Sequence, residues 1–162
     1  MITRIIITTL GASICFSAFA AEDKEETVTL DSIPAAAAKA LKEQAGGEKI
    51  KHVSKEKDDG KTVFEASFSK KGRVHEVTVD EAGKLVSDEE VIPLAEAPEA
   101  VRAAIEKEHP GGKVDKIEKI TEDGEVSYEA LISAKGKREE IKFDSKGKVL
   151  EREDKTGEKG ND

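Results

Sequence analysis

The chain has few of the residues that carry redox, stacking and metal chemistry. Among its 162 residues are one cysteine, one tyrosine and no tryptophan, and aromatic residues make up only 4% of the sequence. The single cysteine, Cys15, excludes an internal disulfide and a metal site built from several cysteines. The scarcity of aromatic side chains disfavours a site for sugars or nucleobases, because those ligands stack on aromatic rings.

Common catalytic motifs are also missing. The sequence has no glycine-rich phosphate loop, no His-Glu-x-x-His pattern and no recognisable Ser-His-Asp arrangement. Its three histidines, His52, His75 and His109, do not recur at matching places in the repeated segment described below. They therefore indicate no shared metal site, and their roles stay open. We predict a protein that is not an enzyme, with no catalytic residue, no cofactor and no metal ligand.

Acidic residues outnumber basic ones. The 35 Asp and Glu residues exceed the 27 Lys and Arg residues, which gives a formal net charge of −8. An acidic surface repels the phosphates of nucleic acids and of anionic lipids, so neither is expected as a partner. The same charge suits a basic protein surface.

The first 20 residues have the pattern of a secretory signal peptide. Arg4 precedes an apolar stretch from Ile5 to Phe19, and Ala18-Phe19-Ala20 fits the small-x-small rule for cleavage after its last residue. The stretch is short for a membrane anchor, and the residue before Cys15 is too large for a lipoprotein signal. We expect residues 1–20 to be removed, which leaves a periplasmic or secreted protein with no membrane insertion.

A segment of the chain recurs 64 residues later without a gap. Pro34 corresponds to Pro98, and Asp59-Gly60 corresponds to Asp123-Gly124. Such self-similarity indicates one supersecondary unit that is present twice. We assign residues 27–88 to the first repeat and 91–151 to the second, with the segment Ser87 to Ala97 as the link, and we expect residues 152–162 to be a disordered tail.

Each repeat is predicted to begin with a helix and to continue as four strands. Apolar residues follow Pro34 and Pro98 at helical spacing, and Asp-Gly pairs predict tight hairpins. In the second strand, Phe64, Ala66 and Phe68 alternate with polar residues. The first strand breaks this alternation, which predicts a bulge. The predicted fold class is α+β: two tandem repeats, each a helix packed on a four-stranded antiparallel sheet.

These motifs resemble a known family. The segments IPAAAAKAL and APEAVRAAI, each followed by Gly-Gly, an Asp-Gly turn and Asp-x-x-Gly-Lys, are similar to the PepSY-like, beta-lactamase-inhibitor-like family. The resemblance covers both repeats. It implies tandem helix-plus-sheet units whose sheets form a concave face that grips another protein, and related domains are linked to peptidase inhibition and to propeptides.

The sheet face that points away from the helices is the predicted binding surface. Its outward positions mix apolar, polar and charged residues, as protein interfaces do. The predicted protein-binding residues are Val63, Glu65, Ser67, Val74, Glu76, Thr78, Leu131, Arg138, Glu140 and Lys142. The predicted function is that of an exported module that binds another extracytoplasmic protein, as a candidate inhibitor of a peptidase or other enzyme.

Two other functions remain open at the sequence level. The first is binding of a small ligand or cation at the acidic turns Asp58-Asp59-Gly60 and Glu122-Asp123-Gly124, although these turns have too few oxygen ligands for a calcium loop. The second is a hydrolase that uses repeated carboxylates, which are Glu65, Glu76, Glu129 and Glu140. Solvated faces and ordinary turn chemistry explain the same residues more simply.

Overall fold

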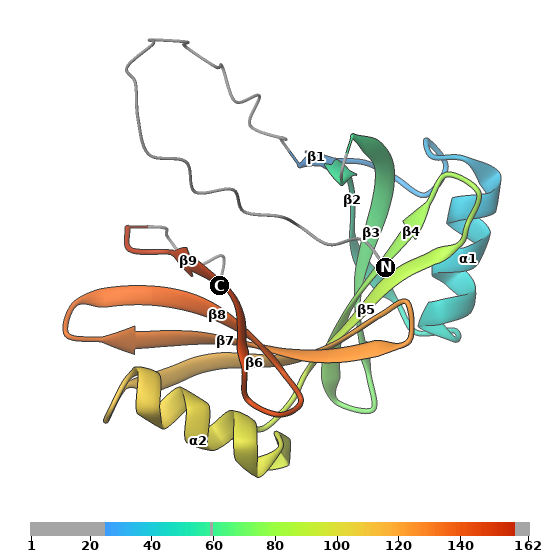
Figure 1. Ribbon diagram of the computed structural model, residues 1–162. Helices are drawn as coiled ribbons and strands as arrows, with labels where there is room; N and C mark the ends of the chain where they lie inside the picture. The colour runs from blue at the N-terminus through green and yellow to red at the C-terminus, as the bar shows by residue number, and fades with distance from the viewer. Residues whose placement is uncertain (1–24, 59, 158–162) are drawn as a thin grey trace, which may run out of the picture.

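The computed structural model describes residues 25–58 and 60–157, and nine strands in this part of the chain form one antiparallel sheet (Figure 1). The order of the strands in the sheet follows their order in the chain. The strands are β1 Glu26–Thr27, β2 Ile50–Asp58, β3 Lys61–Lys70, β4 Arg73–Asp80, β5 Leu85–Val91, β6 Lys113–Glu122, β7 Glu125–Ala134, β8 Lys137–Asp144 and β9 Val149–Asp154.

Two α-helices lie against this sheet in the described part of the chain. Helix α1 is Ala35–Ala45 and helix α2 is Glu99–Glu108, with a short 3-10 helix, η1, at Leu94–Glu96. The cross-strand register runs from Val77 under α1 through Asp88 and Thr121 to β7, which places both helices on the same face of the sheet. In Figure 1 the helices lie on the outer side of the bent sheet, and we call the opposite side the helix-free face.

The predicted fold class is wrong in its arrangement, because the strands do not form two separate four-stranded sheets. The segment expected to link the repeats continues as β5, which pairs with β6 from Ser87 opposite Glu122 to Val91 opposite Glu118. If β5 and β6 were left as edges, each would expose unpaired N–H and C=O groups, and pairing them satisfies both rows. The fold is therefore one continuous sheet with two helices on one face.

Each helix covers its own apolar core. Side chains of α1 pack on β3 and β4, where Phe68, Ala66 and Val79 are almost fully buried. Side chains of α2 pack on β7 and β8, where Ile132, Ile141 and Phe143 are fully buried. Burial of such apolar side chains contributes about 1.5–3 kcal/mol each, so the two cores fix the positions of the strands beneath the helices.

Local backbone features recur at the 64-residue spacing. The predicted bulge is confirmed, since the register shifts between Ile50 and His52 and again between Val114 and Lys116. The turn after β4 has Gly83 at φ +80°, where an added Cβ would lie 2.6 Å from the carbonyl oxygen of Ala36 in α1. Gly147 at φ +79° packs in the same way against α2. These glycines let each helix approach a turn of the sheet closely.

Two predictions about the chain ends meet the structure only in part. The signal peptide at residues 1–20 lies outside the described residues. The expected tail begins within the sheet, because β9 extends to Asp154, and residues 158–162 also lie outside the described part. Within residues 25–58 and 60–157, neither helix is long and apolar enough to cross a membrane.

Candidate functional site

The helix-free face carries all ten of the predicted protein-binding residues. The five on β3 and β4 that follow Val63, and the four on β7 and β8, have their Cα partners on the same side of the sheet. Val63 and Thr78 are buried on this face, whereas Val74 is 40% exposed. Whether these residues bind a protein stays a prediction.

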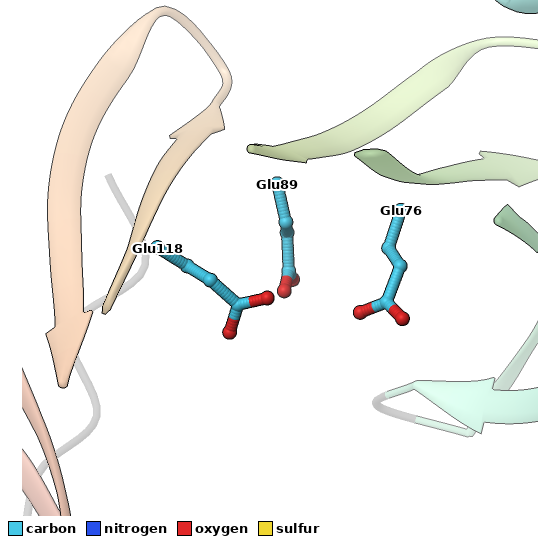
Figure 2. Close-up of side chains that lie close together, drawn as sticks. All are labelled: Glu76, Glu89 and Glu118. Carbon is cyan, nitrogen blue, oxygen red and sulfur yellow. The ribbon is translucent and has the colours of Figure 1, made fainter. Parts of the chain in front are cut away.

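A band of carboxylates crosses the middle of the helix-free face. Glu65, Glu76, Glu89, Glu118 and Glu129 come from five successive strands, β3 to β7. Glu76 lies directly opposite Glu89, and Glu118 lies directly opposite Glu129. Oxygen atoms of three of them, Glu76, Glu89 and Glu118, lie within 4.8 Å of one another, as Figure 2 shows. Negative charge is therefore concentrated where the first four strands join the last four.

Burial and mutual repulsion disfavour the ionised form of these groups. Burial, with a further contribution from Glu118, raises the pKa of Glu89 to about 8. Burial, with a further contribution from Glu76, raises the pKa of Glu65 to about 7. Burial together with Glu140 raises the pKa of Glu129 to about 7 as well. Near neutral pH the band therefore carries less charge than its composition suggests.

Glu118 differs from the others in having a cation beside it. Its side chain is 3% exposed, and the Lys116 ammonium lies 2.7 Å from its carboxylate. Burial raises the pKa of Glu118, whereas the Lys116 ammonium acts in the opposite direction. The field of Lys116 also reaches Glu76. This pair shows how the sheet itself can neutralise a buried carboxylate.

Cations on the helix-free face are confined to the second half of the sheet. Lys142 lies 3.9 Å from Glu122, and Lys155 lies 3.6 Å from Glu140. In the first half, Glu65, Glu76 and Glu89 form no ion pair with any described residue. The positions 64 residues before Lys116, Arg138 and Lys142 are occupied by His52, Val74 and Thr78.

The three histidines lie apart, and each has its own carboxylate. His52 lies 3.4 Å from Glu25, and His109 lies 2.5 Å from Glu139. His75 lies 3.1 Å from Asp88 and stacks on Phe68 with ring centroids 5.6 Å apart. Within the described residues, the histidines do not converge on one site.

The structure places the best geometry for a cation on the sheet rather than at the acidic turns. In the second turn, Asp123 adopts a positive φ of 48° and lies 3.4 Å from Lys84, while Asp59 of the first turn is outside the described residues. By contrast, Glu76, Glu89 and Glu118 bring three carboxylates together.

Sequence reasoning missed Glu89 and Glu118 because it treated the first as part of a linker and left the facing of the strand that carries the second unresolved. Reading residues 85–91 as a strand would have placed Ser87, Glu89 and Val91 on one face. Cross-strand alternation from β4 would then have put Glu89 next to Glu76.

Comparisons with known families confirm the sequence resemblance. Residues 86–151 match the model of the proposed beta-lactamase-inhibitor-like, PepSY-like family. Residues 34–80 match the model of the peptidase propeptide and YPEB domain. Neither description names a catalytic activity. No curated protein matches this chain.

Solved structures from Bacteroides share the fold. A DUF2874 family protein from Bacteroides uniformis is 20% identical, with a TM-score of 0.65 over 78% of this chain and 92% of its own. A protein from Bacteroides eggerthii, described as a proposed periplasmic protein, is 20% identical, with a TM-score of 0.65 over 76% and 90%. A BLIP-like protein from Bacteroides fragilis is 22% identical, with a TM-score of 0.60 over 80% and 90%. At these identities the likeness shows the fold.

Proposed function

We propose that this chain is an exported, non-catalytic module that binds another extracytoplasmic protein through its helix-free face. The observation that carries the proposal is the continuity of this face from β2 to β9, which lets residues from both halves contact one partner. A stable interface needs about 800 Å² on each partner, which is a large area for a four-stranded sheet alone.

The composition of the face supports the same role. Apolar Val74 and Leu131, polar Ser67 and charged Arg138 lie on one side of the sheet, and protein interfaces combine apolar anchors with a charged rim in this way. Strands under two packed helices form a rigid platform, so the side chains are held in place before binding. This arrangement reduces the entropy lost when a partner binds.

Inhibition of a peptidase or another extracytoplasmic enzyme is the more specific part of the proposal. Its support comes from the descriptions of the two matching families, which are beta-lactamase-inhibitor-like and peptidase propeptide. A propeptide and an inhibitor both cover an enzyme's surface without performing chemistry. A periplasmic or secreted location agrees with the sequence pattern of residues 1–20 and with the description of the Bacteroides eggerthii protein.

A capture experiment with surface variants tests the binding role. The mature protein is immobilised and exposed to the native envelope fraction, alongside the variants Val74→Asp and Leu131→Asp. Each aspartate places a charge in the proposed interface, and we expect captured protein to fall at least tenfold while the melting temperature stays nearly unchanged. Leu94→Asp is the matched control, because Leu94 is 37% exposed in η1 and outside the sheet. Capture that survives both sheet variants would show that this face is not the binding surface.

Two other functions are decided by separate measurements. Calcium or zinc at millimolar concentration would raise the melting temperature if a cation site existed in the folded protein. Raised carboxylate pKa values also occur in hydrolases, so the mature protein should be screened for hydrolysis of peptides and glycosides. Turnover that disappears in Glu89→Gln would replace the binding proposal with an enzymatic one. We expect neither a metal-dependent shift nor turnover.

A further inference from the structure

The two halves of the helix-free face differ in how their carboxylates are neutralised. In the second half, Lys116 pairs with Glu118, and Lys142 lies between Glu122 and the opposing Glu129. In the first half, the matching positions hold His52 and Thr78, and no lysine or arginine replaces them. The carboxylates recur, but the cations do not.

We propose that the protein partner presents a lysine or arginine side chain from a projecting loop, and that this cation docks between Glu76 and Glu89 on the helix-free face. The inference rests on the proposed function, and it specifies the chemistry of the partner. The docked cation would do for the first half what Lys116 does for Glu118 in the second.

The geometry suits such a side chain. Glu76 and Glu89 are direct cross-strand neighbours, and their oxygens lie within 4.8 Å of each other. A guanidinium or ammonium group placed between two carboxylates can donate to both at once. Glu65 on the next strand adds to the negative potential, because it also has no ion pair among the described residues.

Charge complementarity favours a basic loop over other protein surfaces. An acidic loop would add to a repulsion that already holds the carboxylates partly protonated, and an apolar loop would bury them without a counter-charge. The cost of an uncompensated buried carboxylate is removed when an oppositely charged group is hydrogen-bonded to it. The net charge of −8 draws a basic partner to the molecule as a whole, whereas the band determines where its side chain docks.

The test uses a labelled hexa-arginine peptide as the probe and the mature full-length chain as the receptor. Binding is followed by fluorescence anisotropy at pH 8 in 50 mM salt. The site variant is the double substitution Glu76→Gln and Glu89→Gln, which keeps side-chain shape and removes two charges. The matched control is Glu48→Gln with Glu81→Gln, because these exposed residues lie off the helix-free face and change the net charge equally.

We expect the site variant to bind the peptide at least tenfold more weakly and the control variant to stay within twofold of the unmodified protein. Thr78→Lys supplies from within the cation that the second half has in Lys142, and it should weaken binding to a similar extent. Melting temperatures of all variants are measured beside the binding curves. Equal weakening by the site and control variants would show that only net charge matters and would overturn the proposal.

Two further outcomes separate this inference from the function on which it rests. If Val74→Asp and Leu131→Asp abolish capture of the native partner while the site variant binds peptide normally, the face is an interface but the docked cation is wrong. If those two variants leave capture unchanged, the proposed function fails whatever the peptide does. A calcium-dependent rise in melting temperature without peptide binding would assign the carboxylates to a metal and would also overturn the inference.

Discussion

Residues 50–91 and residues 113–154 contribute four strands each to the same sheet, and they differ more in charge than in backbone. Both halves have a bulge in the first strand, an αL glycine against a helix, and an aspartate that accepts N–H groups in the preceding turn. On the helix-free face, however, Thr78 stands where Lys142 does, and Ser54 stands where Glu118 does. Backbone devices are fixed by the fold, whereas side chains that face away from the cores are free to differ.

This difference separates the residues that build the protein from those that can give it a partner. Substitutions at the shared devices should affect both halves alike, and they should act on stability. Substitutions on the helix-free face should affect the halves unequally, because only the second half contains its own counter-charges. The following predictions test this division, beginning with the largest effect.

The glycines beneath the helices should be equally important in both halves. Gly83→Ala and Gly147→Ala each force a Cβ against a helix carbonyl at a positive φ, so we expect the free energy of unfolding to fall by about 2–4 kcal/mol in each case. Gly60→Ala is the control, since Gly60 also has a positive φ of 76° but no neighbour within 4 Å of an added Cβ. It should cost about 1 kcal/mol. Urea unfolding measures all three, and a large loss at Gly147 with none at Gly83 would break the comparison.

Removal of a counter-charge should reveal the asymmetry. Lys116→Met keeps the aliphatic part of the side chain but leaves the carboxylate of Glu118 buried without its cation. We expect a loss of about 2 kcal/mol at pH 8. His52→Met alters the matching position of the first half, where the histidine contacts the exposed Glu25, and should change stability by less than about 0.5 kcal/mol. Similar losses in the two variants would show that the halves do not differ in this respect.

The carboxylate band should make stability fall as the pH rises toward 8. A carboxyl whose folded-state pKa is raised stabilises the fold below its ordinary pKa of 4.5, and that contribution is lost as the pH rises through the folded-state value. For Glu89 the folded value is about 8. Glu89→Gln should therefore unfold with about 1 kcal/mol more free energy than the unmodified protein at pH 8.5, and the gap should narrow toward pH 6.

Urea midpoints between pH 6 and 8.5 measure this effect, with Glu81→Gln as the exposed control. Glu65 and Glu129, whose pKa values both rise to about 7, contribute to the same slope from the two halves. A midpoint for Glu89→Gln that runs parallel to that of the unmodified protein across the range would show that Glu89 is not the group that titrates.

Most local structure could be predicted from the sequence because its causes are local. Alternation placed Phe64, Ala66 and Phe68 on the helix side, and the broken alternation of the first strand predicted the bulge. The arrangement of the sheet could not be predicted, because β5 carries Ser87-Asp88-Glu89-Glu90 and lacks the apolar side chains that mark a strand. It lies between the two cores, where neither helix covers it, so its burial depends on neighbours far away in the chain.

The candidate site was predictable to the same extent. The face of each strand follows from period-two alternation, so Glu65, Glu76 and Glu140 were placed by local reasoning. The proximity of Glu89 to Glu118 depends on the pairing of β5 with β6, which is a tertiary fact. The missing cations of the first half become visible only when the two halves are compared side by side, and that comparison needs the register of the whole sheet.

The consecutive order of the strands has a consequence for how the chain acquires its fold. Every strand pairs with its neighbour in sequence, so most contacts close short loops, and such topologies fold faster than those that depend on distant pairings. The connection from Val91 to Lys113, which contains α2, is the longest between strands after β2. We expect the joining of β5 to β6 to form late, so stopped-flow refolding of Ser87→Pro should show faster unfolding and an almost unchanged folding rate. An exported chain that crosses the membrane unfolded would thus have two quickly formed segments to bring together.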